Sequence, residues 1–256
     1  MAPNWPDNAY QRQEILAQWP GQGQATLAAA SVAILGVGGL GSHVAQFLVR
    51  SGVGHLRLVD CDVVEFSNLH RTALYTPEDV GKPKAKAAQQ HLNAINPGCT
   101  VESRVVRVDE GTILEVIRGA DVVVDGFDRL PPRYILNRAC ASSGTPWVHA
   151  GATGHQAQLF PIIPGETACL ACVWPDMPPQ ELVPTCKEVG IFPTLPALVA
   201  AQQARWVVEI LLGLPIHRKI LLIDQAQGDF RTVALSRNPR CPICGDAADV
   251  IGCKKA

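Results

Sequence analysis

The stretch VAILGVGGLGSHVAQFLVRSGVGHLRLVDCD, residues 32–62, decides the fold of this chain. It begins with an apolar, β-branched run, continues through a glycine-rich turn and apolar residues at helical spacing, and ends in a second apolar run followed by acidic residues. A strand, a helix and a second strand within about thirty residues make a βαβ unit, which implies a parallel sheet with helices on its faces. We therefore expect an α/β fold.

The same alternation continues after this unit. Helical patterns at 82–95, 111–120 and 131–144 alternate with strand patterns at 100–108 and 121–127. This order favours a Rossmann-like, mainly parallel sheet flanked by helices.

The later part of the chain has a different pattern. Residues 146–164 predict strands that need not be parallel, and they are followed by a long helix at 195–213 and a strand at 219–225. We expect antiparallel strands and a long helix in this C-terminal part. We divide the chain into a polar N-terminal arm (1–24) and a single domain (25–256), whose two parts are 25–160 and 161–256.

Composition excludes several classes of partner. The 256 residues contain 22 Lys and Arg against 23 Asp and Glu, so the net charge of −1 gives no field that would attract nucleic acid or an anionic membrane. The first thirty residues lack the basic-then-apolar order of a signal peptide, and no apolar run reaches the roughly 18 residues of a membrane span. We expect a cytoplasmic protein that binds neither nucleic acid nor membranes.

The glycine-rich turn predicts a nucleotide site. GVGGLG matches G-x-G-x-x-G at Gly36, Gly38 and Gly41, and Asp60 follows 19 residues after Gly41. Small residues let the backbone approach phosphate, the helix N-terminus favours its charge, and Asp60 can accept a hydrogen bond from a ribose hydroxyl. This motif alone does not distinguish a nicotinamide dinucleotide from ATP.

Charged residues outside the turn favour ATP. Arg71 offers phosphate a planar, permanently charged group. Lys82 and Lys84 begin a helix, where cations oppose the helix dipole, so a bound anion explains them better than helix stability does. Asp125 and Asp128 follow a buried strand at the edge where open α/β sheets bind ligands, and a carboxylate near a triphosphate is a candidate Mg²⁺ ligand.

Two C-x-x-C pairs predict a zinc site. Cys169 and Cys172 form one pair, and Cys241 and Cys244 form the other. Each pair can supply two corners of a tetrahedron from one tight turn. Because four thiolates leave no open position, we expect zinc to stabilise the C-terminal part and take no part in catalysis.

Cys186 is a candidate nucleophile. It lies in a loop bounded by proline and glycine, and Lys187 beside it would lower the pKa of the thiol. From the residues alone, a chemical role and an incidental cysteine stay equally open.

Six motifs together resemble the ThiF/MoeB/HesA family, the bacterial relatives of ubiquitin-activating enzymes. The resemblance covers residues 8–246. It rests on GVGGLGS (36–42), VDCDVVEFSNLHR (59–71), VGKPKA (80–85), DGFD (125–128), the paired C-x-x-C motifs and TCKEVG (185–190).

The resemblance implies an adenylyltransferase. Such enzymes use ATP and Mg²⁺ to adenylate the C-terminal Gly-Gly carboxylate of a ubiquitin-like sulfur-carrier protein, and they release pyrophosphate. It also implies that 25–256 is an adenylation domain in which 25–160 binds the nucleotide and the zinc-containing 161–256 binds the carrier. A homodimer is expected.

The resemblance also assigns roles to single residues. Arg71 and Asn68 would reach the triphosphate, Lys84 would stabilise charge during adenylation, and Asp128 would be tied to Mg²⁺. Arg12, in YQRQEIL, would cross a dimer interface and complete the neighbouring site. Cys186 falls where some members carry a cysteine that bonds covalently to the carrier, although others do not need it. The remaining residues expected at the nucleotide are Gly36, Gly38, Gly39, Gly41, Asp60 and Asp62.

The source of the sulfur and the other possible functions also follow from the sequence. No sulfurtransferase domain follows Cys244 in this chain, so we expect a separate cysteine desulfurase or sulfurtransferase to donate the sulfur. The alternatives are a tRNA threonylcarbamoyladenosine dehydratase, a peptide-nucleotide ligase of the same superfamily, an NAD-dependent oxidoreductase, and an ATP-binding adaptor without turnover.

Overall fold

A computed structural model describes residues 6–179, 183 and 185–246 of the chain. Its strands form one eight-stranded sheet in the order β3-β2-β1-β4-β5-β6-β7-β8. The strands from β3 to β5 in this order pair in parallel. The pairings β5–β6, β6–β7 and β7–β8 are antiparallel, as predicted for the two parts of the chain. The strands are β1 (Ser31–Leu35), β2 (His55–Val59), β3 (Thr100–Arg104), β4 (Val122–Asp125), β5 (Trp147–Thr153), β6 (Gln156–Ile162), β7 (Lys219–Asp224) and β8 (Asp229–Ala234).

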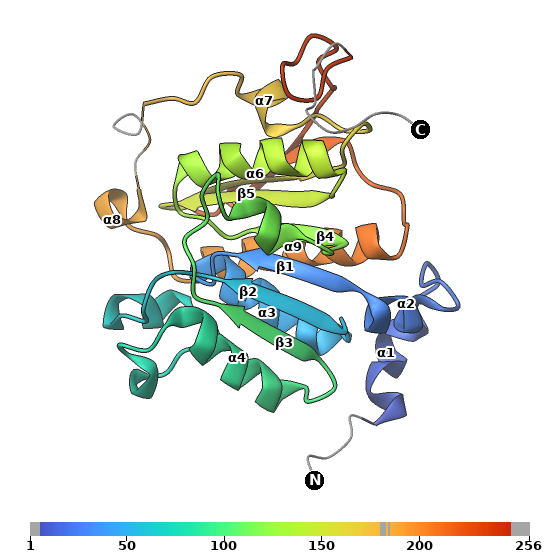
Figure 1. The fold of residues 1–256 in the computed structure, drawn as a ribbon, viewed down its shortest axis with the longest axis vertical. Coiled ribbons are helices and arrows are strands. Elements are labelled where there is room, and N and C mark those ends of the chain that lie inside the picture. Colours follow the sequence, from blue (N-terminus) through green and yellow to red (C-terminus); the bar gives the residue numbers. More distant parts are fainter. Residues whose placement is uncertain (1–5, 180–182, 184, 247–256) are drawn as a thin grey trace.

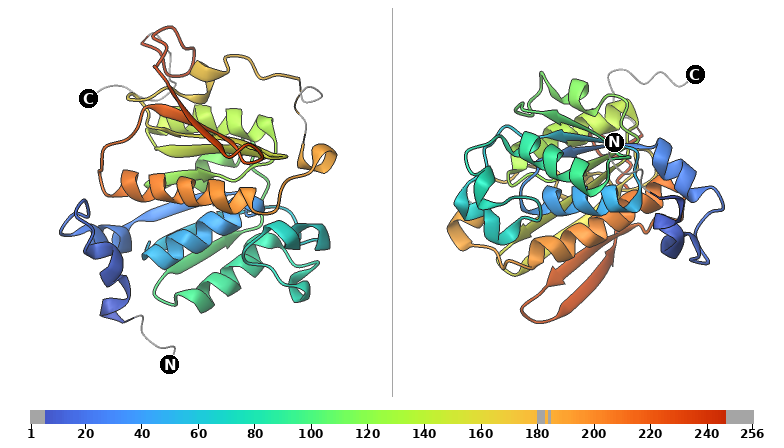
Figure 2. Two further views of the ribbon diagram at one scale, coloured as in Figure 1. Left: turned by 180° about the vertical axis from the view of Figure 1, so that it is seen from behind. Right: turned by 90° about the horizontal axis from the view of Figure 1, so that it is seen from below.

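Helices cover both faces of the sheet (Figures 1 and 2). One face packs against α3 (Gly39–Ser51), α4 (Lys84–Ile95) and α9 (Leu195–Leu211). The opposite face packs against α5 (Ile113–Ile117), α6 (Leu130–Ser143) and α7 (Leu170–Val173). Central parallel strands are therefore buried on both sides, which is why they are continuous apolar runs in the sequence.

Several elements are shorter than their sequence patterns predict, and two of them end at least three residues early. The strand pattern at 100–108 ends at Arg104, because its pairing partner β2 ends at Val59 opposite that residue. The helical pattern at 111–120 ends early because Arg118 leaves the helical region, with φ −57° and ψ 127°.

The N-terminal arm packs at the amino end of β1. It contains η1 (Asp7–Tyr10) and α1 (Gln11–Glu14), and α2 (Gly23–Ala29) begins within it. Gln13 Nε2 donates to Ser51 O at 2.8 Å, which fixes the arm to the last turn of α3. The expected boundary between residues 160 and 161 lies within β6, so both parts share one sheet, and the division into domains stays a prediction.

The turn after β1 is packed tightly against the start of α3. Gly36 has φ +90°, a conformation that favours glycine. A Cβ built on Gly41 would lie 1.9 Å from Gly36 O, so only glycine lets the helix begin this close to the turn.

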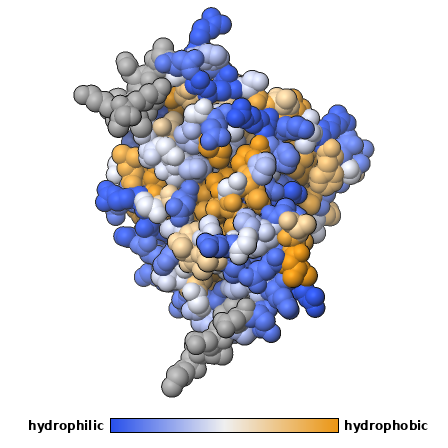
Figure 3. Space-filling model, turned by 90° about the vertical axis from the view of Figure 1, so that its right-hand side faces the viewer, coloured by the Kyte–Doolittle hydropathy of each residue, from blue (hydrophilic) through white to orange (hydrophobic). Residues whose placement is uncertain are grey.

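Within the described residues, no helix is long and apolar enough to cross a membrane. Figure 3 shows the side of the molecule that carries the N-terminal arm, where hydrophilic residues surround a central hydrophobic area.

We predict that Gly41→Ala destabilises the protein and that Gly39→Ala does not. At Gly39 the nearest atoms to an added Cβ belong to Pro196 at an ordinary 3.6 Å, whereas at Gly41 the backbone itself must move. Overpacking of this kind typically costs about 1–3 kcal/mol, against less than about 0.5 kcal/mol for a tolerated change. Urea unfolding measures both values, and equal stability of the two variants would contradict the packing described.

Candidate functional site

The candidate site lies between the carboxyl ends of β1 and β4, from which the chain continues toward opposite sides of the sheet. The chain runs from β1 toward β2 on one side and from β4 toward β5 on the other. The turns that follow β1 and β4 touch, since a Cβ on Gly36 would lie 2.5 Å from Gly126 O. In open α/β sheets, ligands bind in the crevice at such a switch point, outside the carboxyl ends of the strands.

Open space borders the glycine loop on one side. A Cβ on Gly38 would meet no atom within 4 Å, and one on Gly39 would meet only ordinary contacts. Both residues stand at the N-terminus of α3, where backbone N–H groups and the helix dipole favour an anion. The loop therefore has the geometry for phosphate at Gly38 and Gly39, while Gly36 and Gly41 serve its packing.

Asp60 holds the glycine loop in place. Its Oδ2 accepts a hydrogen bond from Val37 N at 2.7 Å, and its Oδ1 accepts one from Asp62 N at 2.8 Å. Burial raises the pKa of this carboxyl, and Lys84 opposes the shift. Each carboxylate oxygen keeps a second lone pair that could accept from a ribose hydroxyl.

Lys84 is brought to the same place by the start of α4. Its Nζ lies 3.1 Å from Asp62 Oδ2, and its side chain is 12 % exposed against 64 % for Asp62. Lys82 points elsewhere and pairs with Asp79 at 3.0 Å. Of the two lysines singled out in the sequence, only Lys84 therefore joins the expected nucleotide residues.

Asn68 and Arg71 lie on η2 (Phe66–Arg71), in the segment between β2 and α4. Asn68 is buried, and its Oδ1 accepts a hydrogen bond from Glu65 N at 3.2 Å, which caps η2. Arg71 Nη1 donates to Ser67 O and lies 3.1 Å from His70 Nε2. Asn68 thus shapes the segment, and Arg71 has further N–H groups for an anion.

Asp125 and Asp128 have opposite environments. Asp125 is fully buried and accepts from Arg133 Nε at 2.9 Å, His149 Nδ1 at 2.8 Å and Phe127 N at 3.0 Å. Burial alone would raise its pKa, but Arg133 and His149 bring the pKa below its usual value. Asp125 is therefore a structural anion, which corrects its interpretation as a Mg²⁺ candidate. Asp128 is exposed.

His149 is buried against aromatic rings. Edge contacts with Trp147, Phe160 and Trp174 surround it, and its Nε2 has no hydrogen-bond partner among the described residues. Burial lowers the pKa of His149, while Asp125 opposes the shift. The ring is therefore the neutral tautomer that donates from Nδ1.

Cys186 begins the short helix α8 (Cys186–Val189), rather than lying in an open loop. Its Sγ lies 3.4 Å from Ala152 O. Burial raises the pKa of the thiol, Arg71 lowers it and Asp128 raises it. The expectation of a lowered pKa is therefore wrong, because burial outweighs the nearby guanidinium charge. The side chain of Lys187 lies outside the described part of the structure.

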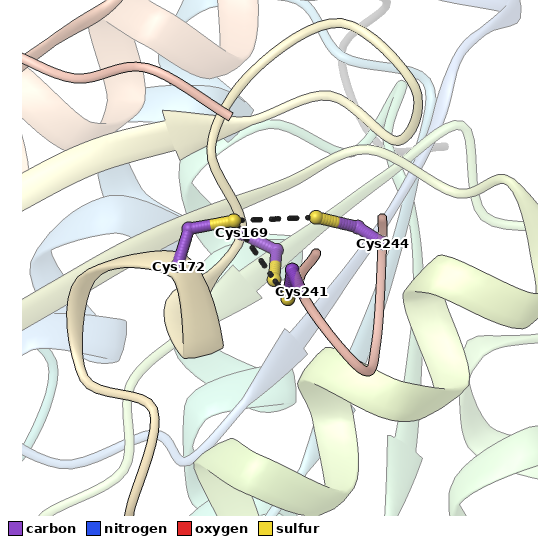
Figure 4. A group of neighbouring side chains, drawn as sticks. All are labelled: Cys169, Cys172, Cys241 and Cys244. Carbon is purple, nitrogen blue, oxygen red and sulfur yellow. Dashed lines mark hydrogen bonds between the residues drawn. The ribbon is translucent and has the colours of Figure 1, made fainter. Parts of the chain in front are cut away.

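The four predicted zinc ligands meet in space (Figure 4). Their sulfur atoms lie within 4.8 Å of one another, with Cys169–Cys241 at 3.6 Å and Cys172–Cys244 at 3.4 Å. Tetrahedral zinc with Zn–S bonds of about 2.3 Å needs sulfur separations of about 3.8 Å. A hydrogen bond from Cys244 lowers the pKa of Cys169, and Asn238 N donates to Cys172 Sγ at 3.3 Å. The cluster fits one metal ion.

Arg12 lies away from the site of its own chain. It belongs to α1, which is fixed to the C-terminal end of α3, whereas the glycine loop is at the N-terminal end. The 13 residues of α3 span about 20 Å. Figure 1 shows α1 on the opposite side of the molecule from α8. Its role in a neighbouring subunit's site stays a prediction.

Three further residues contribute to this edge of the sheet without a signal in the sequence: Tyr75, Arg133 and His149. Tyr75 OH donates to Val37 O at 2.7 Å, and Arg133 Nη2 donates to Ala150 O at 2.8 Å. All three are buried and reach partners far away in the sequence. No local motif marks them, so only the tertiary contacts reveal them.

Comparisons with known proteins match nearly the whole chain. The ThiF family model matches residues 10–243. A sulfur carrier protein adenylyltransferase of Thermus thermophilus is 44% identical over 244 residues, which cover 93% of this chain and 90% of that protein. A SAMP-activating enzyme E1 of Haloferax volcanii is 38% identical over 93% of this chain and 88% of its own length.

Two further matches extend the comparison. The adenylyltransferase and sulfurtransferase MOCS3 of Mus musculus is 38% identical, and the chain spans 53% of its length. The crystal structure of Escherichia coli MccB with ATP superposes with a TM-score of 0.81 at 25% identity, over 94% of this chain and 75% of that one.

We predict that the stability of the protein falls on acidification through His149. Because the folded-state pKa of His149 is lowered, only the unfolded chain gains this proton just below pH 6.5, and stability falls as the pH decreases. The loss is at most about 1.4 kcal/mol per pH unit. His149→Gln, which keeps an N–H donor for Asp125, should show a shallower fall between pH 6.5 and 5 in urea unfolding. Parallel curves for the two proteins would refute this.

We also predict about one zinc ion per chain by mass spectrometry, with a lower melting temperature after chelation. Cys241→Ser should lose the metal. Cys61→Ser is the matched control, because Cys61 is exposed and outside the cluster. A metal-free protein whose melting temperature does not respond to zinc or chelator would overturn the assignment.

Proposed function

The chain belongs to the ThiF family, and from that premise we propose that it uses ATP and Mg²⁺ to adenylate the C-terminal Gly-Gly carboxylate of a ubiquitin-like sulfur-carrier protein. It is an adenylyltransferase, like its relatives of that name. The observation that carries the proposal is the approach of Lys84 to Asp62 beside the loop that Asp60 holds. A cation beside an open glycine loop suits a triphosphate.

The proposed reaction is a displacement at the α-phosphorus of ATP. A carboxylate oxygen of the carrier forms the new bond to phosphorus, and the bond to the β-phosphate oxygen breaks and releases pyrophosphate. Negative charge builds on phosphate oxygens, and Arg71 and Lys84 would stabilise it. No general base is needed because the terminal carboxylate is ionised at neutral pH.

During this step the ammonium group of Lys84 would leave Asp62 and bind a phosphate of ATP. Asp62 is its partner at 3.1 Å and is itself largely exposed. A phosphate in front of the glycine loop would compete for the ammonium group, and an exposed carboxylate loses little when it returns to water. Lys84 is thus held near the loop and stays available to the nucleotide.

Asp128 would hold Mg²⁺. It is exposed three residues after the end of β4, and carboxylate oxygen is the ligand type that this ion prefers. The bound ion would supply charge neutralisation for the phosphates. Asp125 would contribute indirectly, because it fixes the turn through Phe127 N.

Cys186 would act after adenylation, as the nucleophile that bonds to the carrier. An acyl adenylate is an activated acyl group that a sulfur nucleophile can attack, with AMP as the leaving group. The raised pKa of Cys186 keeps it a thiol at neutral pH, and the charge of Arg71 opposes that shift. We therefore assign Cys186 to sulfur transfer, with a separate cysteine desulfurase or sulfurtransferase as the donor.

The proposed assembly is a homodimer. Arg12 stands at the far end of α3, so it could contribute only to the site of another subunit. The N-terminal arm (1–24) would reach across the interface. The zinc-containing part (161–256) would bind the carrier, and its extended Gly-Gly tail would enter without side chains that clash.

The alternatives are less well supported. The similarity to MccB, solved with ATP, favours ATP over a nicotinamide dinucleotide and keeps a peptide-nucleotide ligase as the second candidate. The 44% identity to a sulfur carrier protein adenylyltransferase exceeds the 25% identity to MccB and favours a carrier protein as substrate. With a net charge of −1, the chain offers no global attraction to tRNA.

We predict ATP–pyrophosphate exchange that depends on a carrier ending in Gly-Gly. Asp128→Ala should lower exchange at least about 100-fold, as expected when a main charge-stabilising contact is lost. Cys186→Ala should stay within about twofold of the wild-type protein, because its step follows adenylation. Glu166→Gln, which removes an exposed carboxylate elsewhere, is the control.

Two results would contradict this proposal. One is binding of NADH without carrier-dependent exchange in a panel of Gly-Gly carriers. The other is loss of exchange in a folded Cys186→Ala variant, which would move Cys186 into the adenylation step.

A further inference from the structure

Tyr75 is a buried residue between the glycine loop and the start of α4, and the proposed chemistry does not use it. We propose that Tyr75 is a positioning residue for ATP, because its hydroxyl fixes the glycine loop relative to Lys84. The proposal rests on the proposed function, since ATP is the nucleotide it concerns. Tyr75 acts through the backbone and does not itself contact the nucleotide.

The first observation is that Val37 is held at both of its backbone polar groups. Asp60 Oδ2 accepts a hydrogen bond from Val37 N at 2.7 Å, and Tyr75 OH donates to Val37 O at 2.7 Å. Val37 lies between Gly36 and Gly38, the residue next to open space. A glycine-rich loop has many accessible conformations, so two contacts at one residue restrict it strongly.

The second observation connects the hydroxyl to Lys84. The oxygen of Tyr75 also lies 3.3 Å from Lys84 O, so its single hydrogen is directed mainly to Val37 O and weakly to Lys84 O. Lys84 N donates to Asp62 O at 2.9 Å. One hydroxyl therefore lies at the junction of the glycine loop, the Asp60–Asp62 segment and the first residue of α4.

Burial keeps this hydroxyl a donor. Tyr75 is only 7% exposed. Burial raises the pKa of Tyr75, with Asp60 and Asp79 adding to the shift. The phenol therefore stays protonated at neutral pH and remains a hydrogen-bond donor.

A third contact ties the same segment to α3. Ala73 N donates to Ser42 Oγ at 3.3 Å, two residues before Tyr75 and two after Arg71. Arg71, Lys84 and the loop are expected to contact one triphosphate. Hydrogen bonds thus connect these three segments, and the bonds from Tyr75 and Asp60 to Val37, both 2.7 Å long, hold the glycine loop.

The direct test is Tyr75→Phe, which removes the hydroxyl and keeps the ring. A net hydrogen bond of about 0.5–1.5 kcal/mol corresponds to about a 2- to 12-fold effect. We expect KM for ATP in pyrophosphate exchange to rise about three- to tenfold, with kcat and KM for the carrier within about twofold of wild type. A purely structural role would lower the melting temperature and leave KM for ATP unchanged.

Tyr134→Phe is the matched control. Tyr134 OH also donates to a backbone carbonyl, Trp174 O at 3.1 Å, but it lies on α6 near the cysteine cluster. Its loss should leave KM for ATP unchanged. A folded Tyr75→Phe protein whose KM for ATP stays within twofold of wild type would overturn the proposal.

A second measurement uses the wild-type protein and does not depend on the folding of Tyr75→Phe. The chain has three tyrosines, so ¹³Cζ-labelled tyrosine gives three signals, assigned with Tyr10→Phe and Tyr134→Phe. Saturation with Mg²⁺ and α,β-methylene-ATP should shift the Tyr75 signal and leave that of Tyr134 in place. Nucleotide binding without a shift at Tyr75 would refute the proposal, whereas absence of any ATP binding would refute the proposed function itself.

Discussion

The close contact between the turns after β1 and β4 is the constraint on which the site depends. A Cβ on Gly36 would lie 2.5 Å from Gly126 O, and one on Gly126 would lie 2.3 Å from Gly36 O. β1 and β4 pair in the sheet, neither turn leaves room for a side chain at this contact, and the connections of the two strands leave in opposite directions. This arrangement places the glycine loop and Asp128 after neighbouring strands at the carboxyl edge of the sheet, where open α/β sheets bind ligands.

Two pairs of acidic residues lie at this edge, Asp60 with Asp62 and Asp125 with Asp128, and both divide their roles in the same way. In each pair, the first carboxylate fixes a turn: Asp60 accepts from Val37 N at 2.7 Å and Asp125 accepts from Phe127 N at 3.0 Å. The second carboxylate, Asp62 or Asp128, is exposed. Acidic residues that look alike in the sequence therefore have different physical roles, because a buried carboxylate is stable only when donors surround it. The proposed chemistry falls to the exposed residues and to the cations near them.

Much of the fold could be predicted from the sequence because its signals are local. The βαβ unit, the alternating patterns and the paired C-x-x-C motifs lie within short windows, and the structure confirms the mainly parallel sheet and the meeting of four cysteines. Contacts between distant segments could not be predicted. His149 reaches Asp125 across 24 positions and Tyr75 reaches Val37 across 38, and burial reverses the pKa shift expected for Cys186. Burial and long-range hydrogen bonds exist only after the chain has folded.

The central claim is that ATP lies at the switch point of the sheet, with its phosphates between the glycine loop, Arg71, Lys84 and Asp128. A crystal structure of the protein with Mg²⁺ and α,β-methylene-ATP tests it most directly. We predict phosphate oxygens within hydrogen-bond distance of the backbone near Gly38 and Gly39, Lys84 Nζ on a phosphate, and a ribose hydroxyl on Asp60. A nucleotide bound elsewhere, or a triphosphate that leaves the Lys84–Asp62 pair intact and contacts none of these residues, would contradict the account.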